Sequence, residues 1–392
     1  MEAPELDGER LIATACERTG LDDLGGDEFR AGFDHLLDGL RTEARLNEIG
    51  KLAAPEILLP YLTSRLELQD WHTRHVEIGA VELAPVVFMI GMGRTGTTIL
   101  HDLLAQDPTN RVPRTWEVDK PFPPPETATY DTDPRIAEVQ AGVAAARAAR
   151  PELQAMHPMG ATLAQECVRI TGCEFASLIF LSQFRSPSYL HWLTHDADLA
   201  STYRLHHRFL QLLQWHHRGD RWVLKSGAHL WALPELLAEY PDARFVQTHR
   251  DPVRVIASLA SLFSHIRSMF SDESEMAETS HEWAEPILDA LDRSVTARED
   301  GSIAPDRVVD VPYDAFMADP FVEIRRIYDF LGVELTAPVE QSMRDFLAAN
   351  AVDKHGRHRY SFADTGLDEG ELRERARRYT DYFDVAVEPS RA

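Results

Sequence analysis

The most constraining feature of the sequence is a short apolar run that leads into a glycine-rich loop and then into an amphipathic segment. The run PVVFMI, residues 85–90, is typical of a buried parallel strand. The loop GMGRTGTT, residues 91–98, follows it, and TTILHDLLAQD is typical of a helix that ends before Pro108. Strand, loop and helix in this order predict a phosphate site, because backbone N–H groups at a helix N-terminus bind anions.

This loop has the glycine spacing of a P-loop but lacks the P-loop lysine. Four residues separate Gly91 from Gly96, and Thr97 stands where that motif has Lys. A nucleotide triphosphatase without this cation loses a contact to the β- and γ-phosphates, so the loop favours a different phosphate ligand. Thr97 and Thr98 add hydroxyl donors, and Arg94 supplies a cation within the loop. The alternative is a glycine turn that only joins the strand to the helix.

Three further strand candidates alternate with helical segments, in the runs RWVLKS, ARFVQTHRD and VVDVPY. Such alternation predicts an α/β fold with a P-loop-like, doubly wound parallel sheet flanked by helices. Residues 1–84 indicate an N-terminal helical region. Residues 85–392 then form the phosphate-binding domain, with a helical insertion at about 111–218.

Composition excludes several classes of partner. The chain has 64 acidic and 40 basic residues and a net charge of −24, which argues against non-specific binding of nucleic acid or anionic membranes. The apolar runs are too short to span a bilayer, and the first residues lack the pattern of a signal peptide. The three cysteines fit neither a zinc spacing nor a disulfide framework. We therefore expect a cytoplasmic, metal-free protein, and leave homo-oligomerisation open.

The segment RTGTT after an apolar strand resembles the 5'-phosphosulfate loop of sulfotransferases that use 3'-phosphoadenosine 5'-phosphosulfate (PAPS). Arg94 is similar to the Arg of Golgi-type and many bacterial members, whereas cytosolic members usually carry Lys. A second family motif is an Arg at a strand end with a Ser eight residues later, and THRDPVRVIASLASL supplies Arg250 and Ser258 at this spacing. The resemblance runs from about residue 85 to 385, and it includes WE followed by PP, as in large bacterial members.

The resemblance implies a PAPS site made from three parts of the chain. Arg250 and Ser258 would bind the 3'-phosphate, Tyr313 would contact the adenine, and Arg357 in the basic loop KHGRHRY would close over the nucleotide. The residues expected to bind the 5'-phosphosulfate are Gly93, Arg94, Thr95, Gly96, Thr97 and Thr98. No metal is required, since a 5'-phosphosulfate has no γ-phosphate for a magnesium ion to bridge.

The implied reaction is in-line transfer of the sulfuryl group to a hydroxyl of a small acceptor. Arg94 and Lys225, which ends a strand in WVLKSGAHL, would neutralise the charge that builds on the bridging oxygen. Three residues compete as the base: His157 first, with Glu166 able to orient it, then Glu117, then His229. A His suits base catalysis near neutral pH, whereas a Glu needs its pKa raised by burial.

The acceptor is not identified by the sequence. Residues 175–192 (FASLIFLSQFRSPSYLHW) either line an apolar acceptor pocket or form an ordinary helical core. Two other functions stay open, a nucleotide kinase and a noncatalytic nucleotide-binding protein. The HRD triplet around Arg250 resembles a kinase catalytic loop, but Ile256 stands where a kinase needs Asn, so we interpret Asp251 as the cap of a helix instead.

Overall fold

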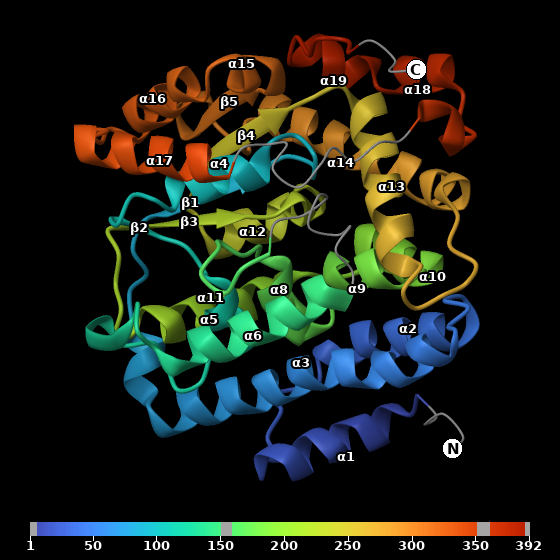
Figure 1. The fold of residues 1–392 in the computed structure, drawn as a ribbon, viewed down its shortest axis with the longest axis vertical. Helices are drawn as coiled ribbons and strands as arrows, with labels where there is room; N and C mark the ends of the chain where they lie inside the picture. Colours follow the sequence, from blue (N-terminus) through green and yellow to red (C-terminus); the bar gives the residue numbers. More distant parts are fainter. Residues whose placement is uncertain (1–5, 150–158, 351–360, 389–392) are drawn as a thin grey trace.

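A parallel sheet lies at the centre of the molecule, with helices on both of its faces (Figure 1). The computed structural model describes residues 6–149, 159–350 and 361–388. Helices α1 to α3 lie at one end of the molecule, and α18 and α19 lie at the opposite end. The expected α/β architecture, a parallel sheet flanked by helices, is confirmed.

The sheet has five parallel strands in the order β2-β3-β1-β4-β5. They are β1 Val86–Ile90, β2 Asn110–Arg111, β3 Arg221–Lys225, β4 Arg244–His249 and β5 Val308–Pro312. Four of the five were predicted. Strand β2 was missed because it has two residues within a proline-rich stretch, where no periodicity can develop.

The helices before the third strand lie mostly in the N-terminal region and the insertion. They are α1 Gly8–Thr19, α2 Phe29–Thr42, α3 Glu48–Arg74, α4 Thr97–Leu104, α5 Thr115–Asp119, α6 Pro134–Ala149, α8 Val168–Thr171, α9 Leu178–Gln183, α10 Pro187–His191, the π-helix η4 Trp192–Asp196 and α11 Ala200–Gln214.

The later helices connect and cover the remaining strands. They are the 3-10 helix η5 Gly227–Trp231, α12 Leu233–Glu239, α13 Pro252–Arg267, α14 Met276–Glu299, α15 Tyr313–Ala318, α16 Pro320–Leu331, α17 Ala337–Ala349, α18 Glu369–Arg375 and α19 Arg377–Tyr382.

Strand β1 is buried on both faces, and its side chains alternate between two hydrophobic clusters. Val87 and Met89 pack in the cluster that contains α4, α15, α16 and α17. Phe88 and Ile90 pack in the larger cluster with α11 to α14 and the N-terminal helices. This period of two explains why an uninterrupted apolar run encodes the strand, as is typical of parallel sheets covered on both sides.

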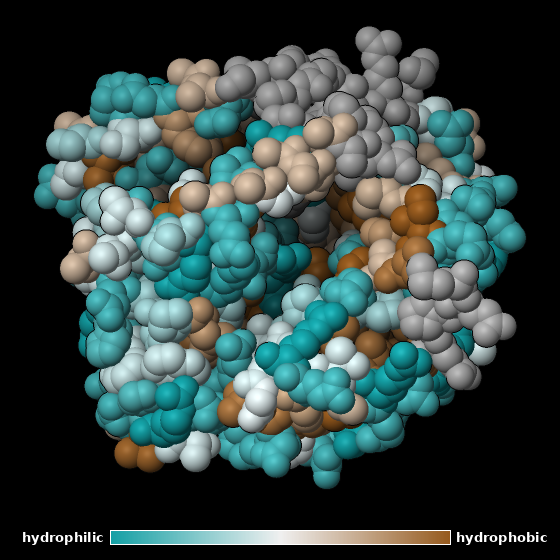
Figure 2. Space-filling view, turned by 60° about the horizontal axis from the view of Figure 1, so that its bottom comes forward, coloured by the Kyte–Doolittle hydropathy of each residue, from teal (hydrophilic) through white to brown (hydrophobic). Residues whose placement is uncertain are grey.

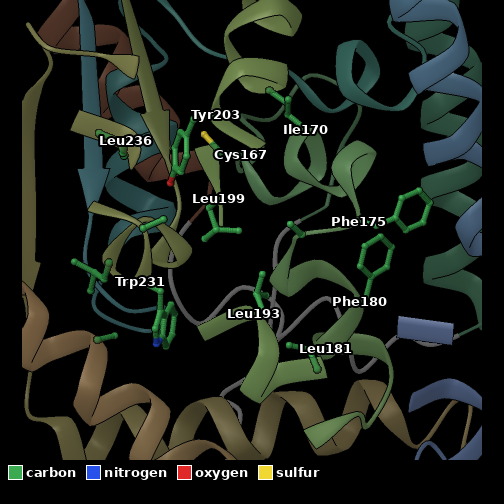
Figure 3. Packing of buried hydrophobic residues seen from close by; sticks show 14 of the residues in the cluster. Cys167, Ile170, Phe175, Phe180, Leu181, Leu193, Leu199, Tyr203, Trp231 and Leu236 are labelled. Carbon is green, nitrogen blue, oxygen red and sulfur yellow. The ribbon is translucent and has the colours of Figure 1, made fainter. Parts of the chain in front are cut away.

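The aromatic residues of the segment 175–192 form core contacts with the N-terminal helices. Phe175 stacks on Phe180 with ring centres 5.6 Å apart, and its edge meets Phe33 of α2 at 4.7 Å. Phe175 and Phe180 lie side by side in Figure 3, and both are fully buried. These rings therefore join the helical insertion to residues 1–84 rather than line an open pocket. The division of the chain at residue 85 stays a prediction.

In the part of the chain that the structure describes, no helix is both long and apolar enough to cross a bilayer.

Candidate active site

The glycine-rich loop leaves β1 at the carboxyl edge of the sheet and depends on backbone conformations that favour glycine. Gly91 has φ 127° and Gly96 has φ 88°, both in the left-handed region. A Cβ on Gly91 would also lie 2.3 Å from Oγ1 of Thr248 on β4. The loop therefore needs Gly91 for close contact with the neighbouring strand, and Gly96 for the turn into α4.

Donors converge where the loop becomes α4. Gly96 is the residue before the helix, so the N–H groups of Thr97 and Thr98 lie in its first turn, where α-helices lack intrahelical acceptors. The hydroxyl of Thr95 behaves differently, because it donates to the Met92 carbonyl oxygen at 2.6 Å and lies 2.6 Å from Oγ1 of Thr248. Thr95 thus holds the loop against β4, and only its backbone is available to an anion.

Lys225 lies on one side of the loop, at the end of β3. Its Nζ donates to Oγ1 of Thr98 at 3.0 Å and forms an ion pair with Oε1 of Glu166 at 2.7 Å. The Lys225 side chain is 3% exposed and that of Glu166 is 28% exposed, so the carboxylate is the more accessible partner. The N–H of Cys167 donates to the Lys225 carbonyl oxygen at 2.9 Å and fixes this segment beside β3.

Arg250 and Ser258 lie on the other side of the loop. Arg250 follows β4, and its Nη1 donates to the Arg94 carbonyl oxygen at 2.7 Å. Ser258 lies on α13, and its Oγ accepts a hydrogen bond from Nε of Arg94 at 3.0 Å. Tyr313, the first residue of α15, lies with its ring centre 4.0 Å from the Arg250 guanidinium. The two motifs from the sequence therefore meet through Arg94.

The side chain of Arg94 contacts the helix that carries the second motif. We expected Arg94 to help neutralise the bridging oxygen, and in the structure its Nε donates to Oγ of Ser258. Arg94 has φ 71°, a left-handed conformation that is uncommon outside glycine. The Arg94 side chain contacts Ser258 of α13, and the Lys225 cation lies beside Thr98.

Asp251 caps α13, as the sequence indicated. Its Oδ1 accepts a hydrogen bond from the Val253 N–H at 3.0 Å, so the carboxylate serves the first turn of the helix. The resemblance to a kinase catalytic loop is therefore accidental.

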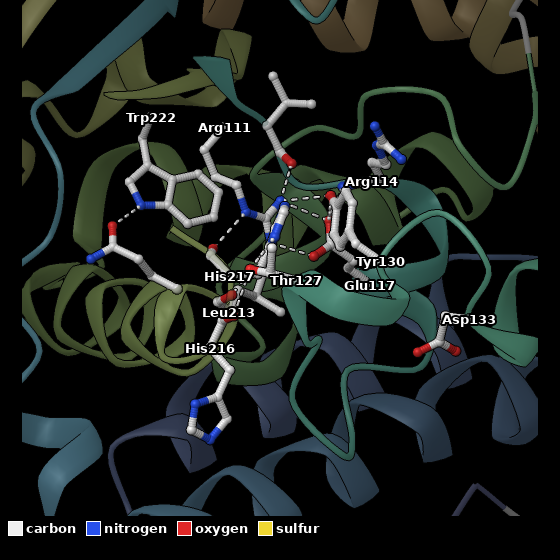
Figure 4. Close-up of polar contacts among 12 residues, drawn as sticks. Arg111, Arg114, Glu117, Thr127, Tyr130, Asp133, Leu213, His216, His217 and Trp222 are labelled. Atoms are coloured by element: carbon white, nitrogen blue, oxygen red, sulfur yellow. Dashed lines mark hydrogen bonds and ion pairs between the residues drawn. The ribbon is translucent and has the colours of Figure 1, made fainter. Parts of the chain in front are cut away.

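Glu117, the second candidate for the base, is fully buried in a polar network (Figure 4). Its Oε1 forms an ion pair with Arg111. Its Oε2 accepts hydrogen bonds from Nη1 of Arg111 at 2.9 Å, from the Tyr130 hydroxyl at 2.8 Å and from the Arg114 N–H at 2.9 Å. Because Arg111, Tyr130 and the Arg114 backbone engage its carboxylate, Glu117 supports the insertion, and we rank it below the accessible candidates as a base.

His229, the third candidate, is also buried. Its Nδ1 lies 2.7 Å from the Tyr203 hydroxyl, and burial lowers its pKa to about 3. A group with so low a pKa accepts a proton poorly at neutral pH. His157, the first candidate, and Arg357 lie outside the described residues.

A small cavity of about 30 Å³ opens beside the end of β3. Its lining includes Ser226 and His229, which follow Lys225, and the Nε2 atom of His229 has no hydrogen-bond partner in the described part of the chain. The apolar side chains that line the cavity come from several helices and can be followed in Figure 3; they include Cys167, Leu193, Leu199, Tyr203 and Trp231. Of residues 175–192, only Ala176 and Leu178 contribute to the lining.

The chain matches the model of the Sulfotransferase family over residues 85–337. It belongs to this family. A solved sulfotransferase STF9 from Mycobacterium avium superposes on the structure with a TM-score of 0.89 at 29% identity, covering 99% of each chain. Another, STF1 from Mycobacterium tuberculosis, gives 0.84 at 30% identity, covering 96% of this sulfotransferase and 99% of that chain.

Two curated relatives carry a more specific name. They are omega-hydroxy-beta-dihydromenaquinone-9 sulfotransferases, Stf3, from Mycobacterium bovis and Mycobacterium tuberculosis. Each is 25% identical to this sulfotransferase over 282 residues, which is 68% of both chains.

Proposed function

We propose that this sulfotransferase transfers the sulfuryl group of PAPS to a hydroxyl of a small, apolar acceptor. The observation that carries the proposal is the convergence of the two motifs: Arg250 donates to the loop at Arg94, and Arg94 donates to Ser258. An anion-binding loop and a second cationic site at the same edge of the sheet suit a ligand that has two phosphate groups.

The arrangement favours PAPS over a nucleoside triphosphate. The N–H groups at the start of α4, with the Thr98 hydroxyl, would bind the 5'-phosphosulfate. Arg250 and Ser258 would bind the 3'-phosphate, because a guanidinium matches phosphate oxygens in charge and geometry. Thr97 in place of the P-loop lysine disfavours a γ-phosphate in the same loop.

In the proposed reaction the acceptor oxygen forms a bond to sulfur while the bond from sulfur to the bridging phosphate oxygen breaks. The electron pair of the broken bond stays on that oxygen, and adenosine 3',5'-bisphosphate leaves. Lys225 would neutralise the developing charge, since its Nζ already lies 3.0 Å from Thr98 at the loop. Arg94 would act from the side of the loop that faces Ser258.

The acceptor proton needs a base, and two candidates remain. His157 stays the first candidate from the sequence. Glu166 becomes the second, because it pairs with the Lys225 cation and its side chain is partly accessible. Comparing kcat for His157→Ala and Glu166→Gln, each checked for folding, separates the two.

An apolar acceptor is supported by the side chains beside the end of β3. They are mainly apolar and line a cavity of about 30 Å³, which is too small to hold an acceptor but gives this side of the site an apolar surface. Figure 2 shows a hollow on one face of the molecule, with hydrophobic side chains along part of its rim. The relatives named for a hydroxylated dihydromenaquinone act on such a molecule, and we propose that this chain also takes a hydroxyl on an apolar body.

The proposal is tested by turnover with sulfur-labelled PAPS against panels of lipid, sterol, phenol, polyketide and glycan hydroxyls. We expect label transfer to apolar alcohols or phenols, and loss of transfer in Lys225→Ala at unchanged folding. Label transfer only to glycans would contradict the apolar acceptor, and binding of ATP in preference to PAPS would contradict the donor.

A further inference from the structure

The carboxylate of Glu388 forms an ion pair with the guanidinium of Arg250, the group that we assign to the 3'-phosphate. Oε1 of Glu388 accepts from Nε of Arg250 at 2.6 Å, and Oε2 accepts from Nη2 at 3.0 Å. This is the bidentate geometry in which Arg binds carboxylate and phosphate groups alike. The two side chains are 12% and 24% exposed, so the pair is partly shielded from water.

The segment that carries Glu388 is attached to the same site by its backbone. Asp251 follows Arg250 in the sequence, and its Oδ2 accepts a hydrogen bond from the N–H of Glu388 at 2.9 Å. Nη1 of Arg373, on α18, lies 3.2 Å from the same oxygen and helps to hold this carboxylate in place. Glu388 therefore reaches Arg250 from a fixed position, and not as an unrestrained side chain.

Arg250 keeps its other contacts while it binds Glu388. Its Nη1 still donates to the Arg94 carbonyl oxygen, and its guanidinium still lies over the Tyr313 ring. The guanidinium is thus already oriented, and the Nε and Nη2 edge that holds the Glu388 carboxylate is the edge available to an incoming phosphate.

From these contacts we infer that Glu388 is a specificity-determining residue, an internal anion that a ligand must displace from Arg250. The inference rests on the proposed function, because it takes Arg250 as the 3'-phosphate site. A tethered carboxylate acts at an effective concentration on the order of millimolar or more, so free phosphate or sulfate competes with it poorly. A nucleotide held by the glycine-rich loop brings its own tethered 3'-phosphate, which carries more charge than a carboxylate and displaces it.

Glu388→Gln tests the inference, because it removes the charge and keeps the shape. Calorimetry measures the binding of adenosine 3',5'-bisphosphate and of AMP, which lacks the 3'-phosphate. If Arg250 is free of Glu388 in about one molecule in ten, the substitution lowers the Kd of the bisphosphate about tenfold. The Kd of AMP then changes by less than about twofold. Inorganic sulfate at millimolar concentration then competes with the bisphosphate in Glu388→Gln more strongly than in the unmodified chain.

Asp381→Asn is the matched control, since it removes one negative charge from exposed α19 of the same region. Equal tightening in both variants, or equal tightening of AMP and the bisphosphate, means a general charge effect and overturns the inference. Unchanged or weaker bisphosphate binding in Glu388→Gln also overturns the inference. If Glu388→Gln does not fold, the same measurements are made on Glu388→Ala. If the unmodified chain and Glu388→Gln both fail to bind the bisphosphate, the proposed function fails, and this inference fails with it.

Discussion

Replacing Glu117 with Gln is expected to destabilise the fold rather than to stop the chemistry. Glu117 is fully buried, and its carboxylate accepts hydrogen bonds from Arg111, Tyr130 and the backbone of Arg114. Arg111 is buried as well and stacks over Trp222, with its guanidinium 4.7 Å from the ring centre, so it cannot turn to solvent. Removing one charge of a buried pair costs about 3 to 5 kcal/mol, because the other charge stays buried without its partner.

Urea unfolding followed by circular dichroism measures this loss, and turnover at low temperature measures kcat of the folded fraction. The control is Glu138→Gln, which breaks the exposed pair between Glu138 and Lys120 and should change the unfolding free energy by less than about 1 kcal/mol. We expect Glu117→Gln to unfold at much lower urea with kcat within about threefold of the unmodified chain, well short of the loss that removal of a base causes. A variant of normal stability whose kcat falls by about 10²-fold or more would show that Glu117 is the base and refute this reasoning.

Three further results are expected. Arg250→Ala should weaken the binding of adenosine 3',5'-bisphosphate by about 1.5 to 3 kcal/mol and the binding of AMP far less, as measured by calorimetry. Equal weakening of both ligands contradicts the 3'-phosphate assignment. Sulfation should survive exhaustive EDTA treatment, and a loss that magnesium reverses would favour a kinase-like mechanism. Burial raises the pKa of Asp102 to about 6, so the folded state holds this proton more tightly than the unfolded state, where the pKa is near 4. The stability that the protonated carboxyl contributes is complete below about pH 4 and is lost as the pH rises through about 6. Asp102→Asn should therefore gain about 1 to 2 kcal/mol over the unmodified chain between pH 5 and pH 8 in urea unfolding, and a constant difference would contradict this.

The sheet and the convergence of the phosphate motifs follow from local sequence. The short β-branched run VVFMI before a glycine-rich loop is typical of a strand buried on both faces, and parallel strands present their carboxyl ends at one edge. Gly91 and Arg250 follow β1 and β4, so both could be expected at this edge, whereas the adjacency of the two strands is known only from the order of the sheet.

Other features of the site depend on tertiary contacts that leave no local pattern. Arg94 contacts Ser258 and has a backbone φ of 71°, and no residue propensity predicts either feature for an arginine. Glu388 lies 138 residues from Arg250, and Glu166 lies 59 residues from Lys225, so neither pair has a spacing that a sequence pattern could reveal.

The segment 175–192 shows the opposite limitation. Aromatic residues in a helical insertion fit either a ligand pocket or a core, since both bury apolar surface. The packing of Phe175 between Phe180 and Phe33 assigns these two aromatic residues of the segment to the core, whereas Ala176 and Leu178 line the cavity beside β3.

The measurement that tests the central claim most directly is label transfer from sulfur-labelled PAPS, with the release of adenosine 3',5'-bisphosphate followed in the same reaction. The account predicts sulfated acceptor and bisphosphate in equal amounts, in the presence of EDTA, and loss of both in Lys225→Ala. Phosphate transfer from ATP, with no sulfate transfer from PAPS to any acceptor class, would contradict it.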